Sequence, residues 1–287
     1  MSMFAEVTLS RPLNEALAIV RHVPFRVTVC LIVIGLFALA AVAPTVLQTH
    51  DPLAIDLASA LQSPSIGHWL GTDQLGRDLY SRVVEGAGQS LTIGLGATAL
   101  SMSIAIVFGV AAALSGGVLD SILSRIVDVL FAIPTLLLAL VFVSVSGPSV
   151  STEVIAVGIG TAPGYARMIR GQVLSVKGAG YVEAAKVLGH PFRRIVWRHI
   201  LPNAMNPLTA MMTIGVGQAI IWASGLAFLG LGVAPPAPEW GALLNAGRNY
   251  VIYAWWLEII PGLAVTAFAL SVTIVGRHLQ DRLEGKW

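Results

Sequence analysis

Long apolar stretches separate the charged positions along the chain. A helix that crosses a membrane needs roughly 20 mostly apolar residues to cover about 30 Å of hydrocarbon. Four stretches contain no Asp, Glu, Lys or Arg at 27–50, 86–119, 129–152 and 199–238. Two more have shorter uncharged cores of 13 and 18 residues, which apolar flanks extend to about 149–169 and 253–276. The pattern therefore predicts six spanning helices.

Lys and Arg collect on one side of these predicted spans. With the N-terminus in the cytoplasm, 14 of the 17 basic residues face the cytoplasm, and only Arg77, Arg82 and Arg248 lie outside. Acidic residues gather on the outer side, Glu153 and Glu239 among them. Basic residues beside the ends of spanning helices favour the cytoplasm. We therefore predict that both termini are cytoplasmic.

The composition excludes several classes of protein. Of the 287 residues, 56% are hydrophobic and only 11% are charged, whereas soluble domains have about 25% charged residues. A soluble enzyme and a disordered chain are therefore excluded. Cys30 is the single cysteine, so no intrachain disulfide can form, and the net charge of +2 gives no general basic excess for binding nucleic acid. The first apolar stretch is too long for a cleavable signal peptide.

These observations predict an all-α polytopic membrane protein with six transmembrane helices. We divide the chain into a cytoplasmic tail at 1–26, a first span at 27–47, an external segment with an interfacial helix at 48–88, a five-helix core at 89–279 with a cytoplasmic loop at 167–203, and a cytoplasmic tail at 280–287.

Ionisable side chains at membrane depth are few. We interpret Asp128 and Glu258 as residues at the ends of helices rather than as proton carriers, since ion-driven transporters depend on buried charges. The spans carry Gly and Pro instead, for example Pro134, Pro163 and Gly217. Small residues let helices approach closely, so helix packing is the simplest interpretation.

The cytoplasmic loop has a pattern of its own. A short helix is favoured through Glu183, Ala184 and Ala185, and Gly189 can adopt the positive φ that ends it. Pro191 can open a second, basic segment that ends where Leu201-Pro202-Asn203 breaks the helix. On charge alone, such a loop is typical of one that binds anionic lipid headgroups.

The order of residues in this loop, Glu-Ala-Ala, three residues, Gly, eleven residues and Leu-Pro, resembles the Glu-Ala-Ala loop of permease subunits in ATP-binding-cassette (ABC) importers. In that family the loop docks in a cleft of the ATPase subunit. The resemblance implies a coupling interface made by Glu183, Ala184, Ala185, Gly189, Arg193, Arg194 and Pro202.

A second motif, His-Trp-Leu-Gly-Thr-Asp-Gln-Leu-Gly-Arg-Asp-Leu-Tyr-Ser-Arg at 68–82, is similar to a hallmark of the C-type permease in dipeptide, oligopeptide and nickel importers. Asp73 can cap backbone amides, Gly76 permits a tight bend, and the two arginines can pair with Asp73, Asp78 or Glu85. We interpret the motif as structural rather than substrate-binding. Its residues are Gly71, Thr72, Asp73, Gly76, Arg77, Asp78, Ser81 and Arg82.

The resemblance extends over most of the chain, from about residue 51 to 281, and includes Pro-Gly-Tyr-Ala-Arg at 163–167 and Pro-Glu-Trp-Gly at 238–241. It implies the type I ABC importer fold, a heterodimer with a homologous B-type permease, two ATPase subunits that bind ATP and Mg²⁺, and an external solute-binding protein. It also implies the cytoplasmic membrane of a bacterium or archaeon.

The chain itself carries no sign of catalytic chemistry. It has no Gly-x-x-x-x-Gly-Lys-Ser/Thr loop, so ATP hydrolysis is left to partners and no cofactor is predicted. The six histidines show no metal-ligand spacing, and no carboxylate pair is predicted to share a cavity.

The cargo and the transport mechanism have alternatives. Within the family, peptide is the first expectation, and nickel, a metal chelate or an opine are alternatives. An ion-coupled secondary transporter and a membrane scaffold without transport activity are the rival classes. The scarcity of predicted buried charges disfavours the secondary transporter.

Overall fold

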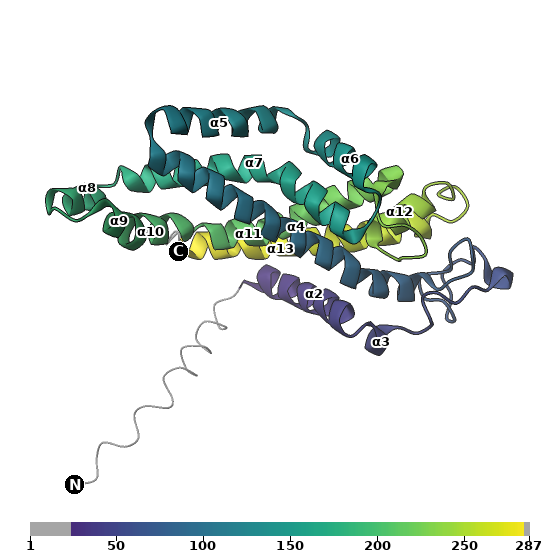
Figure 1. Ribbon diagram of the computed structural model, residues 1–287. Coiled ribbons are helices and arrows are strands. Elements are labelled where there is room, and N and C mark those ends of the chain that lie inside the picture. Colours follow the sequence, from purple (N-terminus) through teal and green to yellow (C-terminus); the bar gives the residue numbers. More distant parts are fainter. Residues whose placement is uncertain (1–23, 284–287) are drawn as a thin grey trace, which may run out of the picture.

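The computed structural model describes residues 24–283, which are helical apart from loops and one isolated β-bridge between Thr72 and Asp78. Most of the tail predicted at 1–26 and half of the tail predicted at 280–287 therefore lie outside the described residues, whereas residues 280–283 are helical. Four long helices, α4 (Leu79–Ser115), α7 (Val150–Lys177), α11 (Leu208–Leu226) and α13 (Trp256–Leu283), run along the length of the molecule (Figure 1).

Shorter elements surround these four helices. They are α2 (Phe25–Val42), α3 (Pro44–Leu47), η1 (Leu57–Ser59), α5 (Gly117–Ala132), α6 (Thr135–Ser146), α8 (Gly180–Val187), α9 (Phe192–Ile195), η2 (Val196–Ile200), α10 (Leu201–Met205), η3 (Ala227–Leu231) and α12 (Trp240–Gly247). Elements α8 to α10 form one end of the molecule, and α12 lies with the 48–78 loop at the other end (Figure 1).

The described residues include four helices long and apolar enough to cross a membrane, namely α2, α4, α11 with η3, and α13. The bent pair α5 and α6 brings the number to five if it counts as one span. Helix α7 carries Arg167, Arg170 and Lys177 and does not meet the same apolar criterion, yet it has 28 residues and packs along α4. The all-α class is confirmed, whereas the number of six spans stays a prediction.

The external segment predicted at 48–88 does not end where we expected. The predicted interfacial helix is not a separate element, because α4 continues without a break from Leu79 to Ser115, and the boundary at residue 88 falls inside it. Asp78 begins this 37-residue helix by accepting a hydrogen bond from the Ser81 amide at 2.8 Å. Amphipathic character in its first turns reflects burial against the rest of the protein, since Leu79 is only 1% exposed.

The third predicted span is wrong as a single straight helix. Helices α5 and α6 meet at an angle of 84°, with Ile133 and Pro134 in extended conformations between them. Proline disfavours the α conformation of the preceding residue and lacks an amide hydrogen, which explains the break. An absence of charged residues marks the length of an apolar stretch but does not show where the helix bends.

Small residues hold the long helices together. A Cβ atom at Gly217 of α11 would lie 2.9 Å from the Ala269 carbonyl oxygen of α13, and one at Gly109 of α4 would lie 2.7 Å from the Ala166 carbonyl oxygen of α7. Backbone contact of this kind leaves no room for a side chain. The expectation that glycines serve helix packing is confirmed at these two positions.

Candidate functional site

The segment from α8 to α10 folds as a two-armed elbow at one end of the molecule. Helix α8 ends at Val187 with Leu188 as its C-cap, and Gly189 then adopts a φ of +75°, as predicted. His190 donates its backbone amide to the Ala185 carbonyl, which closes the turn, and Pro191 stands directly before α9. The elbow therefore has a fixed angle that local chain geometry determines.

Its inner face is apolar and joined to the long helices. Val182, Ala185 and Ile195 are at most 5% exposed and belong to a core cluster that includes Ile169 and Val173 of α7. Ala185, expected at the coupling interface, is therefore a residue of the protein's own core. Such packing makes the elbow rigid relative to α7.

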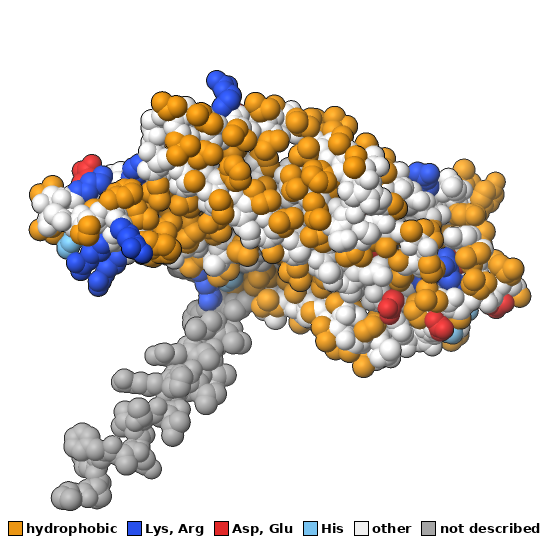
Figure 2. Space-filling view, viewed as in Figure 1, with side chains coloured by type: hydrophobic (Ala, Val, Ile, Leu, Met, Phe, Trp, Pro, Cys, Tyr) orange, Lys and Arg blue, Asp and Glu red, His pale blue; other side chains and the backbone are white. Residues whose placement is uncertain are grey.

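The outer face is exposed and basic. The other six predicted interface residues are exposed, and they are Glu183, Ala184, Gly189, Arg193, Arg194 and Pro202. Large apolar side chains accompany them, including Leu188 at 75% and Trp197 at 67% exposure. Figure 2 shows Lys and Arg gathered at this end of the molecule. An exposed surface that mixes arginines with large apolar groups is typical of a protein-binding site.

The break predicted at Leu201-Pro202-Asn203 is wrong. The chain stays helical from α9 through η2, a π-helical turn, into α10, where Pro202 occupies the first turn. The Leu201 amide donates to the Val196 carbonyl, five residues earlier. A π-turn of this kind leaves space for the proline ring, so the helix continues. The basic arm is consequently continuous with the segment that leads into α11.

A cavity of about 470 Å³ opens beside the bend between α5 and α6. Its polar lining comes from Thr135, Thr161, Tyr165, Arg167 and Gln218, and Trp222 adds an aromatic surface. Arg167 is held in place, because its guanidinium pairs with Asp128 at 2.6 Å and lies 4.3 Å from the Phe131 ring centroid. The sequence alone could not assign a lining, since these residues come from three separate helices.

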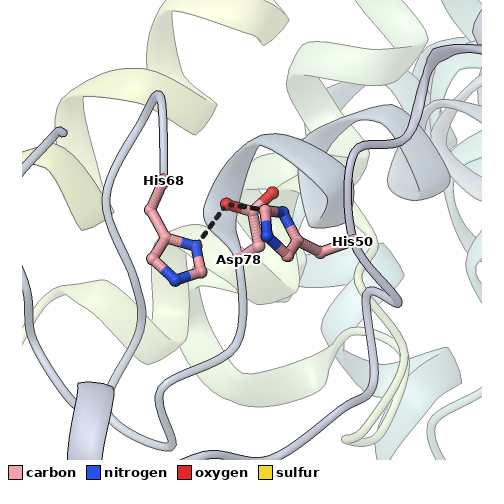
Figure 3. A group of neighbouring side chains, drawn as sticks. All are labelled: His50, His68 and Asp78. Carbon is pink, nitrogen blue, oxygen red and sulfur yellow. Dashed lines mark hydrogen bonds and ion pairs between the residues drawn. The ribbon is translucent and has the colours of Figure 1, made fainter. Parts of the chain in front are cut away.

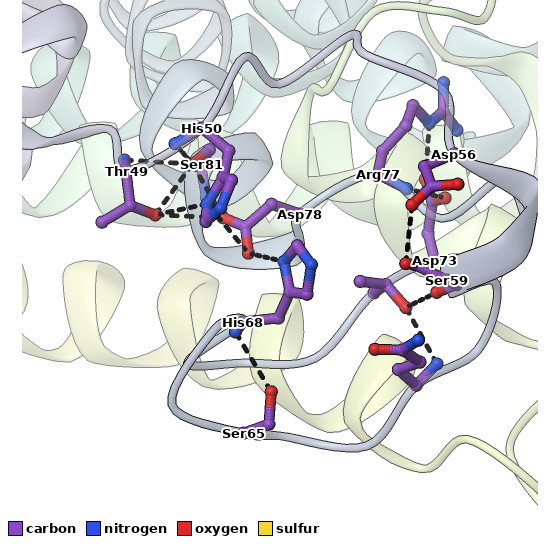
Figure 4. Close-up of polar contacts among 12 residues, drawn as sticks. Thr49, His50, Asp56, Ser59, Ser65, His68, Asp73, Arg77, Asp78 and Ser81 are labelled. Atoms are coloured by element: carbon purple, nitrogen blue, oxygen red, sulfur yellow. Dashed lines mark hydrogen bonds and ion pairs between the residues drawn. The ribbon is translucent and has the colours of Figure 1, made fainter.

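The external motif forms a compact polar knot between the end of α3 and the start of α4 (Figure 4). Asp73 accepts hydrogen bonds from the Leu75 and Arg77 amides, and its other oxygen pairs with Arg77 Nε at 2.6 Å and Arg82 Nε at 3.5 Å. Gly76 has a φ of +75°. All eight motif residues are buried, which supports the structural interpretation.

Asp78 and Glu85 do not pair with the arginines. Glu85 accepts a hydrogen bond from Gln48, whereas Asp78 faces His50 and His68 (Figure 3). His50, His68 and Asp78 each offer one potential metal-ligand atom, and these three atoms lie within 4.8 Å of one another. Spacing along the chain does not reveal this group, because the residues are 18 and 10 positions apart and no metal motif has those spacings.

Two carboxyl groups expected at the outer surface are instead buried. Glu153 is 0% and Glu239 is 1% exposed. They flank Ala227, because a Cβ at Gly232 would approach both Ala227 and Glu153, and one at Gly241 would approach both Ala227 and Glu239. The two carboxyl groups therefore lie near each other in the interior, although neither lines one of the cavities described for residues 24–283.

The environments of these two carboxyl groups differ. Glu239 accepts hydrogen bonds from the Gly241 and Ala242 amides and from the Ser90 hydroxyl. Burial raises the pKa of Glu239, and these three donors oppose the shift. Within residues 24–283, neither oxygen of Glu153 has a hydrogen-bond partner.

Long apolar helices, an exposed basic elbow and a cavity with some polar lining at a helix bend are features expected of a membrane permease. Residues 105–286 match the family model described as "Binding-protein-dependent transport system inner membrane component". This match covers more than half of the chain, and the chain belongs to that family. It is accordingly a multi-pass membrane protein.

Curated relatives resemble nearly the whole chain. The chain is 39% identical to the probable D,D-dipeptide transport system permease protein DdpC of Escherichia coli (strain K12), over 92% of this chain and 88% of that protein. It is 36% identical to the dipeptide transport system permease protein DppC of Alkalihalophilus pseudofirmus, over 89% and 84%. It is 40% identical to the glutathione transport system permease protein GsiD of Pectobacterium atrosepticum, over 78% and 75%.

Solved structures share the fold at low sequence identity. A chain of the MetNI methionine ABC transporter in an inward-facing conformation superposes with a TM-score of 0.59, at 18% identity, over 70% of this chain and 96% of that one. A chain of an amino acid ABC transporter gives 0.58 at 15% identity, over 70% and 94%. The fold is therefore that of an ABC importer permease.

Proposed function

We propose that this chain is one pore-forming permease subunit of an ATP-driven importer that carries peptides across the cytoplasmic membrane of a bacterium or archaeon. The observation that carries the proposal is the 36–40% identity to permeases named for D,D-dipeptide, dipeptide and glutathione transport. These names favour peptide over nickel, a metal chelate or an opine as cargo.

The partners follow from the same proposal. A homologous B-type permease completes the pore, two ATPase subunits bind ATP and Mg²⁺ and contact the elbow, and an external solute-binding protein delivers the peptide. The exposed Glu183, Arg193 and Arg194 supply directional contacts at the ATPase interface. The exposed Leu188 and Trp197 supply apolar area beside them.

The elbow would couple ATP binding to movement of the spans. Its inner face is packed on α7 and its arm continues into α10, so a displacement of the elbow moves whole helices. The ATPase pair biases the permease toward one state only if it binds the elbow more tightly in that state. The cavity lined by α6, α7 and α11 is the part of the chain best suited to form a wall of the peptide pathway.

Transport in vesicles tests this function. We expect the permease pair with its ATPases to hydrolyse ATP faster when peptide-loaded binding protein is added, and mass spectrometry of the co-purified binding protein to find a peptide. Uptake that survives ATP depletion and is abolished by an ionophore would instead show a secondary transporter. Co-purification with ATPases without stimulated hydrolysis would favour a scaffold.

Gly189 offers a sharp test of the elbow. Gly189→Val should abolish peptide-stimulated ATP hydrolysis while the complex still inserts and assembles, because a β-branched residue strains a φ of +75° and changes the angle between the two arms. Gly171→Ala is the matched control, since Gly171 has equally open space around it but lies inside helix α7. Stimulated hydrolysis that is equal in both variants contradicts the coupling role.

A further inference from the structure

We propose that His50, His68 and Asp78 bind one divalent transition-metal cation of the zinc class, at the end of the molecule opposite the elbow. Nδ1 of His68 lies 2.9 Å and Nδ1 of His50 lies 3.9 Å from the same oxygen, Oδ1 of Asp78 (Figure 3). The two imidazole rings are 4.8 Å apart between centroids and tilted by 33°. Three potential ligands thus converge on one point.

These separations suit a tetrahedral cation. With metal–ligand distances of about 2.0–2.1 Å, neighbouring ligand atoms in a tetrahedral zinc site lie roughly 3.3 Å apart. The two observed distances bracket that value, and the ligand atoms of the two histidines lie within 4.8 Å of each other. The His50 side chain is 44% exposed, and its Nδ1, which contacts the Thr49 hydroxyl at 3.1 Å, would leave that hydroxyl to bind the cation. Two imidazoles with one carboxylate favour zinc-class cations, whereas calcium and magnesium prefer oxygen ligands throughout.

The electrostatics of Asp78 support a bound cation. The side chain of Asp78 is 1% exposed, and within residues 24–283 the ion pairs that it makes are with the two histidines. The neighbouring Arg77 and Arg82 are both directed to Asp73. Ser81 and Thr49 donate hydrogen bonds to Oδ2 of Asp78, and a positive charge beside Oδ1 would stabilise this buried carboxylate further. A divalent cation held by all three groups provides it.

The backbone positions of the three residues are already fixed by hydrogen bonds. Ser81 Oγ donates to Asp78 Oδ2 at 2.7 Å and accepts from the His50 amide at 3.1 Å, so one hydroxyl connects two of the ligand residues (Figure 4). His68 is held by the Ser65 hydroxyl, which accepts from its amide. Oδ2 of Asp78 serves the helix cap, whereas Oδ1 faces the imidazoles, so the cation would replace the hydrogen bond between His68 Nδ1 and Oδ1.

The site would have three protein ligands and an open fourth position on its exposed His50 side. Such a site exchanges its metal, unlike closed four-ligand structural sites. A bound cation would cross-link the chain after α3, the 48–78 loop and the start of α4. We therefore expect it to stabilise the loop, independently of whether the protein transports peptides.

Metal titration of the full-length chain tests the proposal. The protein, purified in detergent with a tag free of histidine and treated with a chelator, is titrated with Zn²⁺ against a chromogenic competitor, and Co²⁺ is added separately to record its absorption spectrum. We expect one zinc per chain, a cobalt spectrum typical of tetrahedral coordination, and a higher Tm with zinc. His50→Ala should weaken zinc binding by about tenfold or more, since even indirect support of a metal ligand contributes that much.

Two control variants distinguish a metal site from a simple ion pair between histidine and aspartate. Asp51→Asn removes a neighbouring exposed carboxylate that accepts a hydrogen bond from the Leu53 amide, and it should leave zinc affinity unchanged. His50→Ala keeps the His68–Asp78 hydrogen bond, so its fold is expected to survive, and circular dichroism checks this. Equal zinc affinity in the wild type and His50→Ala, or a Tm that responds to pH but not to zinc, overturns the proposal and leaves a protonated histidine as the partner of Asp78.

Discussion

Glu239 shows how a single buried side chain can stabilise a junction between helices. Its carboxylate caps α12 through the Gly241 and Ala242 amides and also accepts from Ser90 of α4. Trp240, which is fully buried, follows directly, and its indole donates to the Val83 carbonyl at 2.9 Å. These bonds attach α12 to α4 at the end of the molecule opposite the elbow. Glu153 is nearby and equally buried, but within residues 24–283 its carboxyl group has no hydrogen-bond partner.

The same amide substitution should therefore have opposite effects at the two carboxyl groups. Glu239→Gln replaces an accepting oxygen with a donating nitrogen, and we expect it to lower the free energy of unfolding by about 1 kcal/mol or more, as loss of a helix cap does. Glu153→Gln breaks no hydrogen bond within the described residues and puts a side chain that cannot ionise in place of a buried, unpartnered carboxyl group, so stability should stay equal or rise.

Thermal unfolding in detergent, followed by tryptophan fluorescence, measures both effects, since Trp240 reports on the region directly. The two variants serve as controls for each other, because they make the same chemical change at similar depth. Equal losses of Tm would contradict the assignment of the cap to Glu239.

Contacts between residues that are close in the sequence can be predicted from it, whereas contacts between residues that are far apart in the sequence cannot. Asp73 with Arg77 and Gly76 form a local turn, which turn chemistry predicts over five residues. His50 meets Asp78 only because the chain folds back over 28 positions, and Glu153 meets Glu239 across 86. No rule of spacing predicts contacts of that kind, because they depend on how the helices pack.

Among the elements, close helix contacts depend on glycines that have no space for a side chain. Gly217 of α11 faces the Ala269 backbone of α13, with a potential Cβ 2.9 Å from the carbonyl oxygen and 3.2 Å from Cα. Gly35 of α2 also lies within a helix, but nothing lies within 4 Å of its potential Cβ. The two glycines differ in packing rather than in local conformation.

We expect Gly217→Ala to destabilise the protein by about 1–3 kcal/mol, because the extra methyl group forces α11 and α13 apart. Gly35→Ala should leave stability unchanged or raise it slightly, since alanine is the better helix former. Thermal unfolding in the same detergent compares the two. A loss of similar size in both variants would show that helix propensity, and not the α11–α13 contact, decides the outcome.

The long elements were predictable because an apolar stretch of sufficient length has few alternatives in a membrane. Their interruptions were harder to predict from the sequence. Pro134 breaks a helix and Pro202 does not, although both follow apolar residues. The difference arises from the π-turn at Val196–Ile200, which has no recognised sequence signal here and moves the proline ring away from the preceding turn.

On the scale of the whole molecule, the two groups of functional side chains lie at opposite ends. The elbow with its exposed arginines lies at one end, and the polar knot with its histidines lies at the other, with the long helices between them (Figures 1 and 2). The basic bias of the first end predicts that it faces the cytoplasm. This separation fits the proposed partners, because ATPases would contact the elbow from the cytoplasm and a binding protein would act on the opposite side of the membrane.

Cysteine labelling can test this orientation in the native membrane. Cys30 is the single cysteine of the chain, lies in α2 and is 7% exposed, so the unmodified protein should resist a membrane-impermeant maleimide. In a Cys30→Ala background, Ser63→Cys should react in intact spheroplasts, because residue 63 is exposed in the external segment. Lys186→Cys, exposed on α8, should react only after the membrane is permeabilised. Labelling of Lys186→Cys from outside would reverse the topology, and the elbow could then not meet an ATPase.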